Sequence, residues 1–126
     1  MPVDIEPLCQ ELRNCRAETN ANRMMLGEIR ERVRDSGVAR ILQPRNHGGA
    51  GGPLRNIVAA LTRIGGACGS SGWVIAQYIL HNYMVSHWPA AGREAVWGKD
   101  PKALVAGILV PSFGCYEVME DGYSVS

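Results

Sequence analysis

The segment Trp73–Val85 constrains the fold more than any other part of this chain. It is apolar nearly all the way round a helix, and its polar positions are Gln77, His81 and Asn82. It falls short of the roughly 20 apolar residues that a membrane-spanning helix needs. A helix that is apolar on nearly every face is expected at the centre of a domain. We therefore expect a mainly α-helical fold built around this segment.

The flanks of this helix carry start and stop signals. Ser70 or Ser71 is expected to cap it, and Pro89 to end it. By composition alone the stretch Gly65–Gly72 before it is typical of a loop, because each glycine weakens a helix by about 1 kcal/mol relative to alanine. A short break between two helices fits this composition as well. After Pro89, a short helix is expected from Ala91 to Trp97, where Gly98 stops it.

Three further helices are expected before residue 65. Asp4 can cap the first, whose apolar positions are Leu8, Leu12 and Cys15. The second has one apolar face and a C-terminal glycine suited to a left-handed stop: Met25, Ile29, Val33 and Gly37. The third opens at a proline and has a predicted buried stripe: Pro53, Leu54, Ile57, Val58 and Leu61.

The hydrophobic period changes after about residue 100. The continuous small-apolar run from Ala103 to Val110 is consistent with a buried strand. The segment Glu117–Val125 alternates around Asp121-Gly122, which predicts a β-hairpin. A single hairpin is marginally stable in water, so these strands are expected to need partners.

Charge and cysteine usage exclude several classes of function. Thirteen basic and twelve acidic residues nearly cancel, so no nucleic-acid partner is expected. The four cysteines form no CxxC pair, and the N-terminus has no leader-like pattern. We therefore expect reduced thiols, a cytoplasmic location, no metal site and no membrane partner.

Two glycine-rich motifs resemble functional sites without matching them. The loop Gly48–Gly52 resembles a phosphate cradle, but it lacks the Gly-Lys-Ser/Thr of a P-loop and follows Pro44 rather than a buried strand. The stretch Gly69–Gly72 does not have the G-x-S-x-G spacing of a nucleophile elbow. A flexible or tightly turned connection is the better interpretation of the first motif, and a helix break and cap is the better interpretation of the second.

The second half of the chain also resembles a known family. The residues that carry the resemblance are Ser70-Ser71-Gly72-Trp73-Val74, His81, Trp88-Pro89, Val96-Trp97-Gly98 and Leu104-Val105-Ala106-Gly107. In this order they resemble the N-terminal helical domain of the acyl-CoA dehydrogenase superfamily, and within it the oxygenase components of two-component flavin-dependent monooxygenases. Dehydrogenases typically carry Thr-Glu-Pro where this chain has Leu109-Val110-Pro111, which favours the monooxygenase branch.

The resemblance implies a site that the residues alone do not reveal. It implies that His81 is a catalytic residue facing the flavin and the substrate, although from the residues alone a hydrogen-bonded core histidine is the better explanation. It implies that Leu109, Val110 and Ser112 bind the flavin. Substrate contacts would come from Trp73, Gln77 and Tyr78.

The implied fold is an acyl-CoA dehydrogenase-like N-terminal helical domain over residues 1–102, followed at 103–126 by the first strands of an incomplete β-domain. The implied function of the parent protein is hydroxylation of a small aromatic or polycyclic substrate with reduced FMN or FAD from a flavin reductase, in a tetrameric homo-oligomer. This chain alone is expected to be inactive. An acyl-CoA dehydrogenase with bound FAD and a non-catalytic helical interaction module are the alternatives.

Overall fold

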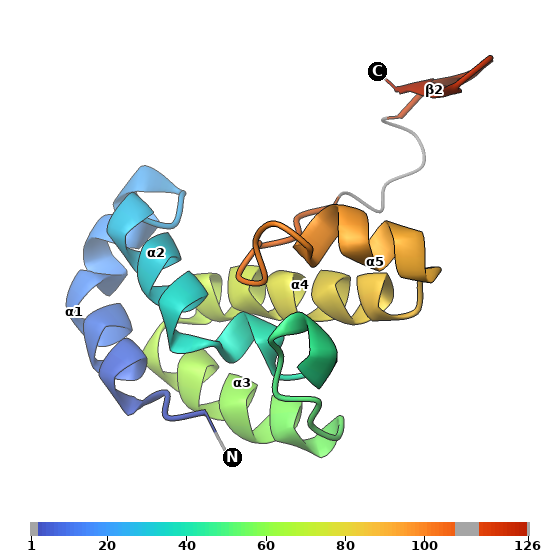
Figure 1. The fold of residues 1–126 in the computed structure, drawn as a ribbon. Helices are drawn as coiled ribbons and strands as arrows, with labels where there is room; N and C mark the ends of the chain where they lie inside the picture. Colours follow the sequence, from blue (N-terminus) through green and yellow to red (C-terminus); the bar gives the residue numbers. More distant parts are fainter. Residues whose placement is uncertain (1–2, 108–113, 126) are drawn as a thin grey trace.

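Helices make up most of the computed structural model, which describes residues 3–107 and 114–125. The described elements are α1 (Glu6–Asn22), α2 (Gly27–Ser36), two 3-10 turns η1 (Val38–Arg40) and η2 (Arg45–His47), α3 (Arg55–Ala67), α4 (Gly69–Ser86), α5 (Ala90–Trp97), and the strands β1 (Tyr116–Met119) and β2 (Gly122–Val125). Figure 1 shows the five helices gathered in one body, with the two strands set apart from them. The predicted mainly α-helical fold is confirmed.

The first two helices form close to where the sequence predicts, although the N-cap residue of α1 is Ile5 rather than Asp4, and Met25 precedes α2. The Oδ1 of Asp4 accepts a hydrogen bond of 3.1 Å from the backbone N–H of Glu6, at the start of α1. Leu8 and Leu12 are buried on the inner face of α1, as Ile29 and Val33 are on that of α2. Gly37 ends α2 with a φ of 78°, a left-handed conformation that glycine adopts without steric cost.

The predicted buried stripe of α3 is partly wrong. Ile57 is buried, but Leu54 and Val58 are 57% and 68% exposed. The residues that α3 buries are instead Ile57, Ala60, Ile64 and Ala67. Both stripes have helical spacing, and the observed one uses two alanines because α4 packs closely against this face. The prediction placed the larger apolar side chains in the buried stripe and overlooked the alanines.

The stretch Gly65–Gly72 contains a short break between two helices, as expected, but not the loop that its composition suggested. Helix α3 continues through Gly65 and Gly66, and α4 begins at Gly69 after the single extended residue Cys68. The two helices lie side by side (Figure 1), and a Cβ on Gly72 would be only 3.0 Å from the Cα of Gly65. These glycines therefore permit close packing of two helix backbones, which outweighs their low helix propensity.

Replacing Gly72 with alanine should lower the free energy of unfolding by about 1–3 kcal/mol, because the new methyl group would push the α3 backbone away. Gly66 provides the matched control. A Cβ there would meet nothing within 4 Å, so Gly66→Ala should stabilise the chain by about 0.4–1 kcal/mol. Urea unfolding of both variants measures the difference, and equal effects of the two substitutions would contradict the close packing.

Neither predicted serine caps α4. The N-cap position is Cys68, and no side chain makes a capping hydrogen bond there. The Ser70 hydroxyl instead donates a 2.9 Å hydrogen bond to Oδ1 of Asn20, which joins the start of α4 to the end of α1. Ser71 is buried. Helix α4 ends at Ser86, and Pro89 lies at the N-cap position of α5.

The β elements follow the prediction only in part. The described residues 103–107 of the predicted strand Ala103–Val110 have no regular structure, and 108–110 lie outside the described residues. The hairpin is confirmed, since β1 and β2 pair antiparallel. Its loop is Glu120-Asp121, one residue earlier than predicted, because Gly122 pairs with Met119 as the first residue of β2.

Candidate active site on helix α4

His81 lies buried where α4 meets the segment 103–107. Its side chain is 5% exposed, and a Cβ placed on Gly107 would lie 3.0 Å from Nε2 of the imidazole ring. Only a glycine at position 107 lets the backbone approach the ring this closely. The Nδ1 atom of His81 is buried and has no hydrogen-bond partner within the described part of the chain. Five other buried side-chain atoms of the described residues also lack a partner, and what sets His81 apart is that its ring lies against the backbone of Gly107. The unpaired Nδ1 leaves a hydrogen bond for a further polar group to make.

The neighbouring residue Asn82 holds α4 in register. Its Nδ2 donates a hydrogen bond of 2.9 Å to the backbone oxygen of Ala39, in η1, and both residues are buried. Ile75 and Ile79 are fully buried on the same helix. Rotation of α4 would therefore break a buried hydrogen bond and expose core side chains. These contacts therefore set the direction in which the Cα–Cβ bond of His81 leaves α4.

The other predicted residues of α4 lie at different depths. Trp73 is 70% exposed, whereas Gln77 and Tyr78 are half-buried and Tyr78 packs against the core. Gln77 and Tyr78 precede His81 by one helical turn and lie beside it. Trp73 is eight residues from His81, or about 12 Å along the helix axis. The structure therefore groups Gln77 and Tyr78 with His81 and leaves the ring of Trp73 one turn further away.

The predicted flavin-binding residues Leu109, Val110 and Ser112 lie outside the described residues. The segment that leads toward them is described up to Gly107. Leu104 is half-buried and packs against the hydrophobic core. From Leu104 the chain runs to Gly107, whose backbone lies against the imidazole ring of His81.

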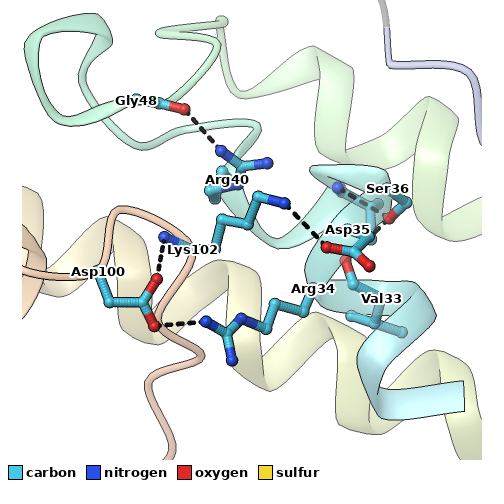
Figure 2. A network of polar contacts seen from close by, with 9 residues as sticks. Val33, Arg34, Asp35, Ser36, Arg40, Gly48, Asp100 and Lys102 are labelled. Atoms are coloured by element: carbon cyan, nitrogen blue, oxygen red, sulfur yellow. Dashed lines mark hydrogen bonds and ion pairs between the residues drawn. The ribbon is translucent and has the colours of Figure 1, made fainter. Parts of the chain in front are cut away.

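Two ion pairs tie the turn before this segment to α2 (Figure 2). Nη2 of Arg34 lies 2.7 Å from Oδ2 of Asp100, and Nζ of Lys102 lies 2.9 Å from Oδ1 of Asp35. The hydrogen bond from Lys102 holds the pKa of the Asp35 carboxyl below its ordinary value. Because that pKa is lower in the folded chain than in the unfolded one, the pair stabilises the fold at neutral pH. The contribution is lost as the pH falls through the lowered pKa.

The side chain of Gln43 joins the same turn to the glycine-rich loop. It is fully buried, and its Nε2 donates hydrogen bonds to the backbone oxygens of His47 and, at 2.9 Å, Pro101. The backbone oxygen of Gln43 accepts a 2.9 Å hydrogen bond from the N–H of Gly51. A Cβ on Gly49 would lie 2.0 Å from that oxygen. The glycines of this loop therefore allow it to wrap around Gln43, in agreement with a structural turn.

Gln43, Asn82 and Gly107 were not singled out by the sequence as parts of a site. Asn82 had a signal, since it interrupts an apolar helix beside His81. Gly107 belongs to a segment that carries the family resemblance, but nothing in the sequence links it to His81. Gln43 had no signal, because its importance comes from contacts with residues far away in the chain. Gln43 meets Pro101 across 58 positions.

The described residues were also compared with the predictions of reduced thiols, no metal site and no membrane-spanning helix. All four cysteines are free. Burial tends to raise the pKa of the Cys68 thiol, but hydrogen bonds with Ser70 and Ser71 outweigh it, so that the pKa is lowered overall. Among the described residues, no group of three His, Cys, Asp or Glu side chains could hold a metal ion. No described helix is long and apolar enough to cross a bilayer.

Comparison with known proteins shows which class of protein this chain is similar to. No protein-family model matches the chain. Its homologues and structural neighbours are oxygenase components of flavin-dependent monooxygenases, which have an acyl-CoA dehydrogenase-like fold. The resemblance inferred from the sequence is therefore confirmed.

Particular relatives make the similarity concrete. The flavin-dependent monooxygenase oxygenase subunit HsaA of Rhodococcus jostii is 29% identical over 122 residues, which are 97% of this chain and 32% of that protein. The oxygenase component of an FADH2-dependent resorcinol hydroxylase from a Rhizobium strain is 32% identical over 94 residues, or 75% of this chain and 23% of that protein. The crystal structure of 3-HSA hydroxylase from Rhodococcus sp. RHA1 matches with a TM-score of 0.87 at 29% identity, over 96% of this chain and 31% of that one.

The matched residues of this chain cover between about a quarter and a third of the length of these relatives. The relatives are named as oxygenase components of flavin-dependent enzymes, and two of them as hydroxylases of resorcinol and of p-hydroxyphenylacetate.

Proposed function

We propose that this chain is the N-terminal part of the oxygenase component of a flavin-dependent monooxygenase. The parent protein would hydroxylate a small aromatic or polycyclic substrate, using reduced FMN or FAD delivered by a separate flavin reductase. In this proposal, residues 1–102 form the helical domain and 103–126 begin a β-domain. The parent protein would be a cytoplasmic homotetramer. The proposal is supported by sequence and structural similarity to flavin-dependent oxygenase components, which extends over nearly the whole of this chain.

The observation that carries the proposal is the buried imidazole of His81, whose Nδ1 has no partner within the described residues. A flavin or a substrate hydroxyl group would supply that partner. Bound reduced flavin supplies the electrons with which molecular oxygen is activated. His81 can donate a hydrogen bond to a ligand or accept the proton of a phenol, because an imidazole has both capacities near neutral pH.

The remaining proposed roles follow from position. Gln77 and Tyr78 lie beside His81 on α4 and are proposed to contact the substrate. The exposed ring of Trp73 offers an aromatic face against which a planar substrate can pack. Leu109, Val110 and Ser112 are proposed to hold the flavin, because they follow the segment that reaches His81.

The test uses the full-length protein, a flavin reductase and NADH. Phenolic substrates should cause oxygen consumption and yield a hydroxylated product, and comparison of FMN with FAD shows which flavin is used. Reduction of an electron acceptor with an acyl-CoA substrate would instead indicate an acyl-CoA dehydrogenase with bound FAD. Absence of both activities in a protein that binds another protein would favour the non-catalytic helical module. Either of these two outcomes would overturn the proposal.

This chain by itself should bind flavin weakly, with a dissociation constant above the low micromolar range. It supplies a single edge of the proposed site and matches about a third of the relatives' length. Equilibrium dialysis against FMN and FAD measures this. Tight binding by these 126 residues would show that the flavin site is complete within them.

A further inference from the structure

The position of Gly107 against His81 depends on a short stretch of chain with few fixed points. Among the described residues, the last backbone hydrogen bond before Gly107 joins the N–H of Ala103 to the oxygen of Asp100, at 3.0 Å. Between there and Gly107, Leu104 packs against the core. The start of the stretch and the packing of Leu104 are therefore the contacts in the described part of the chain that hold Gly107 in place from its N-terminal side.

Asp100 fixes that start through three bonds. Its Oδ2 pairs with Arg34 on α2 at 2.7 Å, and its Oδ1 accepts a 3.0 Å hydrogen bond from the backbone N–H of Lys102 (Figure 2). Its backbone oxygen accepts the bond from Ala103. One carboxylate thus both shapes the turn and ties it to α2. Gln43 holds the same turn from the other side, through the backbone oxygen of Pro101.

We propose that Asp100 is a positioning residue for His81, which it serves by holding residues 100–107 so that Gly107 remains against the imidazole ring. Gln43 assists from the buried side of the turn. This proposal rests on the proposed function only in taking His81 as the residue that meets the ligand. The backbone at Gly107 limits the space on the Nε2 side of the ring and thereby fixes the direction in which Nδ1 points.

The Asp100 contact is suited to positioning rather than to stability. The side chains of Arg34 and Asp100 are 38% and 43% exposed. Ion pairs exposed to this degree contribute little to folding, because solvent screens them and both side chains lose freedom. Asp100→Asn should therefore leave the chain folded while it loosens the turn, which permits a clean test.

The test is made first on the 126-residue chain without flavin, by ¹⁵N NMR of the His81 ring and amide hydrogen exchange. Asp100→Asn should move the ¹⁵N signals of His81 and speed exchange at 103–107 severalfold, with the rest of α4 unchanged. Asp100→Glu, which keeps the carboxylate, should restore much of the wild-type pattern. Gly107→Ala should move the same His81 signals by direct contact.

Glu6→Gln is the matched control, since it makes the same charge change and breaks ion pairs with Arg13 and Arg63 on α1 and α3. It should leave the His81 signals in place. Unchanged His81 signals in Asp100→Asn, or equal changes in Glu6→Gln, would overturn the proposal.

A second measurement separates this proposal from the proposed function. In the full-length enzyme, Asp100→Asn should lower the fraction of oxygen used for hydroxylation, with little change in the KM for the substrate. Unchanged coupling in that variant would overturn the positioning role. A full-length protein without monooxygenase activity would refute the proposed function and leave the NMR result standing.

Discussion

Replacing Trp97 with alanine should lower the free energy of unfolding of this chain by about 3–5 kcal/mol. Trp97 is 1% exposed and is the largest fully buried side chain among the described residues. Its ring packs against that of His47, with 5.4 Å between the ring centroids, and so joins α5 to the turn η2. Alanine would leave a cavity that two short elements cannot close by small movements. Because domains are stable by only about 5–15 kcal/mol, much of the chain's stability would be lost.

Two control variants show that this loss comes from packing. The Nε1 of Trp97 is buried with no hydrogen-bond partner within the described residues, so Trp97→Phe should cost much less than alanine. Trp88 is 46% exposed, and Trp88→Ala should lower stability by less than about 1 kcal/mol. Urea unfolding followed by circular dichroism measures all three. Similar losses in Trp97→Ala and Trp88→Ala would contradict a packing role for Trp97.

Replacing His81 with alanine in the full-length enzyme should reduce hydroxylation about 30- to 1000-fold, which corresponds to the loss of one well-placed hydrogen bond worth roughly 2–4 kcal/mol of the barrier. Oxygen should still be consumed, with more of it released as hydrogen peroxide. Product formation and peroxide release, measured together, give this partition.

His81→Asn separates chemistry from folding. Asparagine fills less space but can still donate and accept hydrogen bonds, so this variant should retain more hydroxylation than His81→Ala. Both variants should show near-wild-type circular dichroism. Full coupling in a well-folded His81→Ala protein would return His81 to the role of a core histidine.

Local signals in the sequence predicted the helical part of the fold well. Gly37 ends α2 because only a left-handed residue fits there, and Ile29 and Val33 form its buried face. The Asp121-Gly122 pair indicated the hairpin to within one residue. Each of these signals comes from residues that are close together in the sequence, so the sequence alone is enough to detect it.

The errors concern residues whose role depends on a distant partner. Gly72 suggested a loop, yet its lack of a side chain serves the approach of Gly65 on another helix. Gln43 gave no signal, because its importance lies in the oxygen of Pro101. His81 was singled out from a family resemblance, but its contact with Gly107 required the three-dimensional structure. Sequence periodicity indicates which face of a helix is buried, but it does not indicate which distant residues pack against that face.

The hairpin has a practical consequence for anyone who purifies this chain. Its apolar side chains Tyr116, Val118, Met119 and Tyr123 are 56–74% exposed, and it forms a two-stranded sheet with two open edges in the described part of the chain. Open edges invite a further strand from a neighbouring molecule. At high concentration this protein should therefore self-associate through the hairpin. Charged substitutions at exposed positions of β1 and β2 should reduce this aggregation without changing the helices.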